Sequence, residues 1–323
     1  MKTIRISLSI MVITCFCLWQ CKKETSPNIN PISGLIGVVT DAKTGKPIEG
    51  VKITYEGADT TVTDSNGRFG IVEITHNVNA LVKAEKNGML TLVQKCAYTP
   101  QDEHIELNFK LTDEIIVKDY EGNQYKTVTI GDQVWMAENL RSKKYADGKN
   151  IDDVWAYYND EANVAVYGRL YNWTAAMKLP PEYLNKEITV NYPHQGVCPI
   201  GWHVPSDDEW LTLQDYCGGE EIAGKKLKTI GNIEDETGLW HKDTDEPLGD
   251  EGTNASGFSA VPGGGLSSHF GSCAYLGYNV HFWSSSPSGG MYAGTKDLSS
   301  GDSWLVPCYF RRAEGFSVRC VQD

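Results

Sequence analysis

The chain has 323 residues, which is more than one ordinary domain contains and indicates at least two domains. Its formal net charge at pH 7 is −13, which argues against nucleic acid as a partner because the phosphates would be repelled. No apolar run in the sequence reaches the ~18 residues that a membrane-spanning helix needs.

The first 20 residues are typical of a signal peptide. Lys2 and Arg5 precede a predominantly apolar stretch whose length fits a secretory core. Neither Ala nor Gly occurs before Gly34, so the small-residue pattern of ordinary cleavage is missing. The segment Leu-Trp-Gln-Cys that ends at Cys21 resembles a bacterial lipoprotein signal, in which the cysteine is lipid-modified and the leader is removed before it.

This resemblance implies a protein of the bacterial outer membrane, attached through lipid on Cys21 and facing either the periplasm or the exterior. Residues 21–31 are polar and bounded by proline, so we expect a flexible tether there. An uncleaved anchor, plain secretion and processing at Cys15 are the alternatives.

Residues 32–111 are predicted to form a small β-sandwich. Val51, Ile53 and Tyr55 alternate with polar residues, which is the period of a half-buried strand. Asn66-Gly67 favours a tight hairpin because both residues tolerate positive φ. Further short β-branched runs at regular spacing complete the pattern.

Three motifs give this region a family resemblance. They are Gly37-Val-Val-Thr-Asp41, Gly45-Lys-Pro-Ile-Glu-Gly-Val51 and Thr63-Asp-Ser-Asn-Gly-Arg-Phe69, which together resemble the carboxypeptidase regulatory-like domain. The resemblance implies a transthyretin-like sandwich without catalytic residues of its own. A binding module and a spacer that lifts the next domain off the membrane both remain open.

The best-signalled helix of the chain begins after Ser206. Ser206 and Glu209 have the spacing of a capping box, and acidic residues occupy the first turn, where the helix dipole favours them. Trp210, Leu213 and Cys217 form a narrow apolar stripe that we expect to face a core. Two glycines at 218–219 are predicted to end the helix.

Residues 115–323 carry the stronger family resemblance. Their motifs lie at 119–140, 167–177, 198–219, 254–264, 282–286 and 315–323. In this order they resemble the Fibrobacter succinogenes major paralogous domain. The resemblance implies bacterial secretion, frequent lipoprotein anchoring and an α+β fold that we expect to be C-type-lectin-like, but no established activity.

Six of the nine cysteines follow Cys21, an even number that is compatible with disulfides in an oxidising compartment. Cys198 and Cys320 both lie in the family motifs, before the main helix and on the last strand, and we predict a disulfide between them. In the chain-entropy model, closing so long a loop contributes about 4–5 kcal/mol as an upper figure. Cys273–Cys308 is a plausible second bridge, which leaves the pairing of Cys96 and Cys217 open.

The candidate motifs for cofactor or metal chemistry are weak, and we predict neither. Residues 219–226 approach a phosphate loop but lack its Ser/Thr and follow a helix. The acidic run 243–251 could attract calcium, yet Pro247 stands where a calcium loop needs an acid. A solvated acidic loop is the favoured interpretation, and calcium binding by 234–252 stays open.

Two function hypotheses follow. The first is a non-catalytic envelope protein that binds a glycan or another surface polymer, with Tyr157, Tyr158, Tyr275 and Tyr278 as candidates for its ligand face because aromatic rings stack on sugars. The second is an unrecognised hydrolase or modifying enzyme that uses scattered carboxylates. An exposed aromatic strip would favour the first, and a pocket with converging carboxylates the second.

Overall fold

The computed structural model describes residues 34–72, 74, 77, 79–97, 104–242 and 251–323. The predicted signal peptide, the lipidation site Cys21, the tether 21–31 and residues 243–250 of the acidic run lie outside the described residues. Residues 32–323 cluster as one compact unit. None of the described helices is long and apolar enough to cross a membrane.

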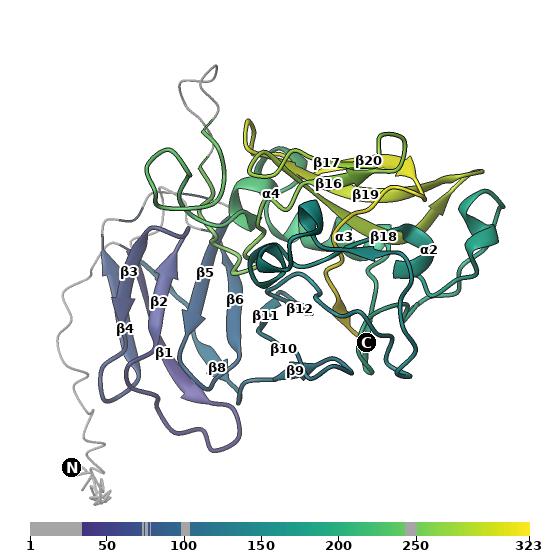
Figure 1. Ribbon diagram of the computed structural model, residues 1–323. Coiled ribbons are helices and arrows are strands. Elements are labelled where there is room, and N and C mark those ends of the chain that lie inside the picture. The colour runs from purple at the N-terminus through teal and green to yellow at the C-terminus, as the bar shows by residue number, and fades with distance from the viewer. Residues whose placement is uncertain (1–33, 73, 75–76, 78, 98–103, 243–250) are drawn as a thin grey trace, which may run out of the picture. The chain divides into compact units, whose positions relative to one another are not determined.

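The N-terminal region is a β-sandwich, as its alternating pattern predicts (Figure 1). One sheet has the order β4-β1-β7, with β8 also paired to β1, and the other contains β2, β3, β5 and β6. The strands are β1 (Gly34–Asp41), β2 (Lys52–Tyr55), β3 (Asp59–Val62), β4 (Arg68–Val72), β5 (Ala80–Glu85), β6 (Thr91–Cys96), β7 (His104–Glu106) and β8 (Phe109–Leu111). Val51, Ile53 and Tyr55 are buried between the sheets, which confirms the predicted alternation.

The turn predicted at Asn66-Gly67 is present, but the predicted hairpin is wrong, because β3 pairs with β2 and β4 pairs with β1 in the other sheet. The Asp64 carboxylate accepts hydrogen bonds from the main-chain N–H groups of Asn66 and Arg68, each at 2.8 Å. Gly67 has φ of +71°, and a Cβ there would come within 2.4 Å of the carbonyl oxygen of Val39. Glycine is therefore required both for the turn and for the close approach to β1.

The second sheet of the sandwich continues into the C-terminal region. Its order is β15-β21-β12-β11-β6-β5-β2-β3, and β6 pairs in parallel with β11 (Thr127–Ile130), with Val128 opposite Thr91. Leu81 and Val93 extend into a core cluster that also holds Trp135 and Trp210. The two regions are therefore joined by main-chain hydrogen bonds and by a shared core, not only by the connecting segment.

The predicted capping box begins helix α3 (Asp207–Tyr216). The Ser206 hydroxyl accepts from the N–H of Glu209 at 3.3 Å, and the Glu209 carboxylate accepts from the N–H of Ser206 at 2.8 Å. Trp210, Leu213 and Cys217 are fully buried, as the stripe predicts. Gly218 and Gly219 follow with φ of +109° and +95°, so the helix ends where the sequence indicates.

Most of the remaining elements are short, apart from the sheet of β18, β19 and β20, and the chain is mostly β with few helices. They are β9 (Val117–Lys118), β10 (Gln124–Tyr125), β12 (Gln133–Met136), β13 (Val154–Trp155), η1 (Tyr157–Asn159), η2 (Glu161–Asn163), α1 (Val164–Tyr167), β14 (Leu170–Tyr171), α2 (Trp173–Ala176), η3 (Pro181–Leu184), β15 (Trp202–His203), α4 (Glu220–Leu227), β16 (Gly265–Ser267), β17 (Ser272–Ala274), β18 (Asn279–Ser288), β19 (Tyr292–Ser299), β20 (Val306–Arg311) and β21 (Val321–Gln322). A core around Trp173 and Trp283 holds this part together.

Candidate functional site

Three of the four tyrosines expected on a ligand face are exposed. Tyr158, Tyr275 and Tyr278 have exposed fractions of 65%, 63% and 49%. Tyr157 is only 1% exposed, so the prediction for this residue is wrong. Its hydroxyl accepts a hydrogen bond from the N–H of Leu276 at 3.0 Å, and burial raises its pKa to about 12. Tyr157 thus anchors η1 beneath the neighbouring loop instead of facing solvent.

The three exposed tyrosines, called the tyrosine face below, are carried by adjoining turns. The N–H of Tyr158 lies 3.3 Å from the sulfur of Cys273, which places η1 against the β16–β17 hairpin. Tyr158 and Tyr275 have φ of +54° and +67°, in the left-handed region that bulky residues rarely adopt. Such strain persists only where the surroundings impose it, and it is common at binding sites.

Tyr278 is held by a stacked histidine. The rings of Tyr278 and His241 lie 4.2 Å apart at an interplanar angle of 20°. The His241 ring is fixed by Glu234 at 2.7 Å, and its main-chain N–H donates to the carbonyl of Gly277 at 2.7 Å. The hydrogen bond to His241 lowers the pKa of Glu234. This arrangement gives Tyr278 a fixed orientation, which reduces the entropy lost on binding.

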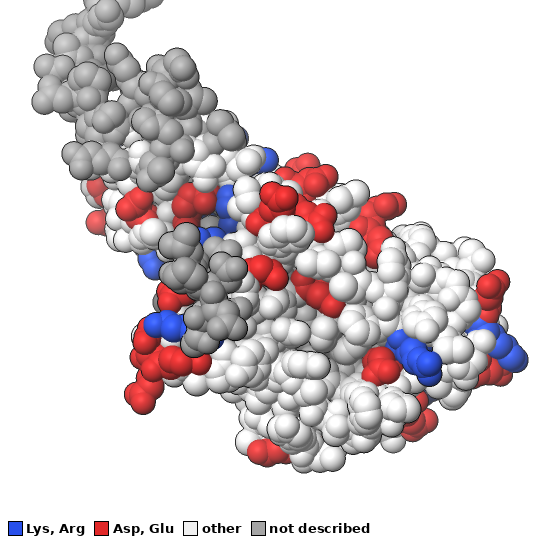
Figure 2. Space-filling model, turned by 90° about the horizontal axis from the view of Figure 1, so that it is seen from above, with Lys and Arg blue, Asp and Glu red and all other residues white. Residues whose placement is uncertain are grey.

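The molecular surface on this side is poor in charge. Figure 2, which looks from above on the side where β16 and β17 lie in Figure 1, shows a broad uncharged area with acidic side chains on several sides of it and fewer basic ones. Phe270, in the loop between β16 and β17, is 77% exposed and adds apolar surface. An aromatic, uncharged face suits a neutral polymer better than an anionic one.

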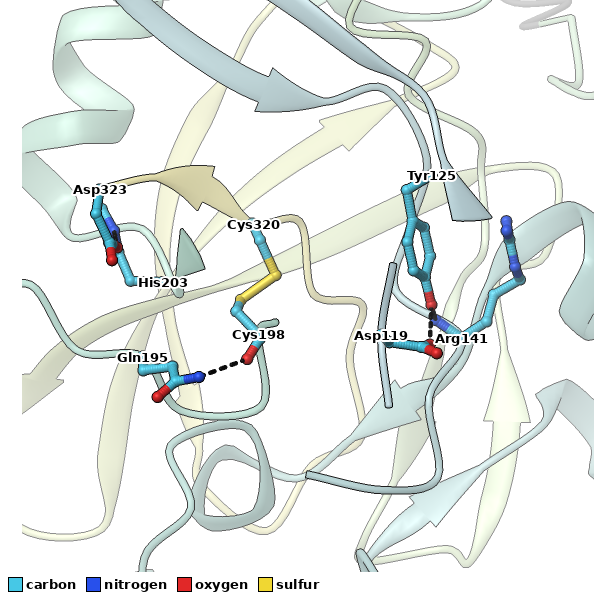
Figure 3. The surroundings of a disulfide bond; sticks show 8 residues. All are labelled: Asp119, Tyr125, Arg141, Gln195, Cys198, His203, Cys320 and Asp323. Carbon is cyan, nitrogen blue, oxygen red and sulfur yellow. Dashed lines mark hydrogen bonds and ion pairs between the residues drawn. A yellow bond between two sulfur atoms is a disulfide. The ribbon is translucent and has the colours of Figure 1, made fainter. Parts of the chain in front are cut away.

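The disulfide between Cys198 and Cys320 is confirmed, with the two Cα atoms 6.0 Å apart (Figure 3). Cys198 precedes β15 and Cys320 precedes β21, and these two strands pair with each other. The bridge therefore fastens the last strand to the segment that leads into α3.

The second predicted bridge, Cys273–Cys308, is wrong because both residues are free thiols. The Cys273 sulfur lies against the main-chain N–H of Tyr158, whereas Cys308 lies on β20 beside Asp297, so each sulfur has a different neighbour. Cys217 is also a free thiol, and burial raises its pKa to about 12.

A Cys-His-Asp grouping occurs on the sheet of β18, β19 and β20. Asp297 lies 2.8 Å from His281 Nδ1 and also contacts Cys308. The carboxylate thus separates the thiol from the imidazole, the reverse of the order in which histidine activates a nucleophile. Burial, followed by Asp297, raises the pKa of Cys308 to about 12, so the thiol stays protonated. This geometry does not support nucleophilic catalysis.

Sequence reasoning missed a buried histidine clamp. His203 lies 2.6 Å from the Glu209 carboxylate through Nε2 and 2.7 Å from Asp323 through Nδ1 (Figure 3 shows His203 and Asp323). Burial lowers the pKa of His203, but the two carboxylates outweigh this effect and the net shift is upward. Glu209 is only six residues from His203 in the sequence, so the sequence could have indicated this contact. Asp323 is brought close to His203 only by the pairing of β15 with β21.

The segments that weakly resemble phosphate-binding and metal-binding motifs can be located in the structure. Residues Glu220–Leu227, which approached a phosphate loop in sequence, form helix α4. Across the described ranges, no group of three or more His, Cys, Asp or Glu side chains is placed to hold a metal ion. The acidic run 243–251 falls almost wholly outside those ranges.

Comparison with protein families gives two matches. The Fibrobacter succinogenes major domain matches residues 128–322, which is more than half of the chain, so the chain belongs to this family. The carboxypeptidase regulatory-like domain matches residues 34–112. Both resemblances found in the sequence are thereby confirmed.

Among solved structures, a mutant type II cohesin–X-dockerin complex from Acetivibrio cellulolyticus matches with 22% sequence identity. The match covers 24% of this chain and 55% of that chain, with a TM-score of 0.20, which is too low to support an inference about fold or function. No curated protein matches the chain.

Proposed function

We propose that the protein is a lipid-anchored, non-catalytic binding protein of the bacterial envelope whose tyrosine face takes a neutral glycan. The observation that carries the proposal is the presence of three exposed tyrosines on adjoining turns, two of them with left-handed backbone and the third stacked on a fixed histidine. Exposed aromatic rings on a rigid support stack on sugar rings at a low entropic cost.

Charge favours a neutral ligand within this class. The chain carries a formal net charge of −13, which repels anionic polymers at long range. The broad white area in Figure 2 contains no basic side chains that would offset that repulsion. A neutral polysaccharide would not be repelled by the net charge, and its sugar rings would supply the apolar faces on which tyrosine rings stack.

The experiment compares Tyr158→Ala, Tyr275→Ala and Tyr278→Ala with wild type by affinity electrophoresis in xylan, galactan and mannan. Loss of a stacked ring should weaken binding by about 1–3 kcal/mol. Tyr309→Ala is the matched control, since Tyr309 is 60% exposed on β20 and outside the tyrosine face. Equal binding by all four variants, or turnover of a polysaccharide by the wild type, would contradict the proposal.

The anchor belongs to the same proposal. Lipid on Cys21 is supported by the apolar leader, by the cysteine that ends it and by the missing small-residue cleavage pattern. Two or three acyl chains would hold the protein stably, whereas one gives only marginal binding. Mass spectrometry of the native protein should find an acylated Cys21 at the N-terminus. A soluble mature form that begins elsewhere would refute the anchor but leave the ligand face untouched.

The C-type-lectin-like fold for 115–323 stays a proposal. It is supported by the capped helix α3 and by the pairing of β21 with β15 beside the disulfide. A comparison of an experimental structure of the protein with lectin-like domains tests this assignment.

A further inference from the structure

A surface pocket of about 500 Å³, whose lining does not include the tyrosines just described, carries several charged side chains. Arg141, Lys143 and Arg169 supply positive charge, and Glu121 and Glu161 supply negative charge, with Glu161 paired to Arg169. Neither family match assigns a role to this pocket.

Arg169 is the fixed part of the pocket. Its side chain is only 5% exposed, and its Nε donates to the carbonyl of Arg141 at 2.9 Å, which sets the plane of the guanidinium group. Both terminal nitrogens, Nη1 and Nη2, donate to the Glu161 carboxylate, the first at 3.1 Å. This two-pronged geometry is the one that guanidinium forms with any carboxylate.

Glu161 is the exposed part. Its side chain is 66% exposed, and it lies in η2, a three-residue 3-10 turn with few main-chain hydrogen bonds to hold it. Hydrogen bonds from Arg169 lower the pKa of Glu161, and the positive charges of Arg169 and Lys143 add to this effect, so the carboxylate is ionised at neutral pH. Such a turn opens more readily than the buried segment that carries Arg169.

The other buried arginines are satisfied differently. Arg312 donates to the main-chain carbonyls of Tyr292, Tyr183 and Lys186. Arg319 donates to Asn139 and to main-chain carbonyls, including that of Met136. Arg169 instead directs its two terminal nitrogens to the solvent side, where the surface carboxylate of Glu161 accepts hydrogen bonds from both. A buried guanidinium needs such a partner, but the partner need not come from the same chain.

We propose that the Glu161 carboxylate occupies this pocket when no ligand is bound. The carboxylate of an acidic sugar, a uronic acid, displaces it from Arg169, and Lys143 contributes positive charge to the binding. The choice of a sugar rests on the proposed function, because Tyr158 and Glu161 are three residues apart and their Cα atoms lie within about 11 Å. A glycan on the tyrosine face would therefore reach the pocket with a neighbouring sugar residue, and an occasional uronate residue would bind there.

The test measures calorimetric binding of galacturonate, with galactose as its neutral match, to the full chain and to Glu161→Gln. Removal of the tethered competitor should strengthen galacturonate binding roughly tenfold or more and leave galactose unchanged. Glu182→Gln is the matched control, since Glu182 also lies in a 3-10 turn and pairs with Lys186 at 3.3 Å on the surface. It should bind as the wild type does.

A second variant separates binding from folding. Lys143→Ala, introduced beside Glu161→Gln, should weaken galacturonate binding several-fold, and galacturonate should raise the melting temperature of Glu161→Gln more than that of wild type. Equal galacturonate affinity in wild type and Glu161→Gln, or no affinity in either, overturns the proposal. Equal binding of N-acetylglycine and galacturonate overturns the assignment to a sugar.

The outcome is distinguishable from that of the glycan experiment. If the tyrosine variants bind neutral polysaccharides as the wild type does while Glu161→Gln gains galacturonate binding, the proposed function fails and the pocket stands. If the tyrosine variants lose binding while Glu161→Gln gains nothing, the pocket proposal fails alone.

Discussion

At the scale of single residues, His203 shows how one side chain couples two distant parts of the chain. It contacts Glu209 at the start of α3 and Asp323 after β21, and its side chain is 4% exposed. Glu209 also completes the capping box of α3. One histidine thus connects a helix terminus to the end of strand β21.

The clamp predicts a pH-dependent stability. Because the pKa of His203 is raised in the folded state, its contribution is complete below about pH 6.5 and is lost as the pH rises through the raised pKa. His203→Gln should cost about 1–2 kcal/mol at pH 6, a charged hydrogen bond discounted for the exposed Asp323, and less at pH 9. Urea unfolding at a series of pH values measures this difference. A variant with the same pH profile as wild type would contradict the clamp.

At the scale of elements, local signals were predictable and long-range pairings were not. The capping box at Ser206, the glycine pair at 218–219 and the turn at Gly67 are set by neighbours within a few residues, so the sequence alone located them. The pairing of β6 with β11 joins Thr91 to Val128, and no local pattern encodes it.

In the candidate site, too, some features were predictable from the sequence and others depended on the folded structure. Aromatic composition identified Tyr158, Tyr275 and Tyr278, but it could not separate them from Tyr157, whose inward direction depends on the conformation of the turn η1 and on the loop packed above it. The pairing of Cys198 with Cys320 followed from motif positions in a known family, whereas Cys273 and Cys308 offered only parity. An even number of cysteines is compatible with disulfides but does not show which cysteines lie close enough to pair.

At the scale of the whole molecule, residues 32–323 form one unit in which a sheet and a core pass between two family-defined regions. A sandwich that acted as a detached spacer would share no core with its neighbour and would unfold by itself. Leu81 and Val93 instead pack in the same cluster as Trp135 and Trp210. We therefore expect one cooperative transition for both regions.

Leu35→Ala tests this expectation. Leu35 is fully buried in the sandwich core, and its truncation should cost about 2–5 kcal/mol. All tryptophans except Trp19 follow residue 115, so their fluorescence reports on the C-terminal region. If both regions unfold together, the tryptophan transition should move to lower denaturant by the amount that circular dichroism records. An unchanged tryptophan midpoint would show that the regions unfold independently.

The pairing of β6 with β11 also protects the protein from self-association. In the intact chain, β6 occupies the hydrogen-bonding groups of β11 along Val128–Ile130. A fragment cut at the family boundary, in the segment between β8 and β11, would leave this strand as an open sheet edge beside an uncovered apolar patch. Such edges recruit strands from other molecules. The regulatory-like sandwich therefore covers a sheet edge of its neighbour, and the two are best produced, exchanged and engineered as a pair.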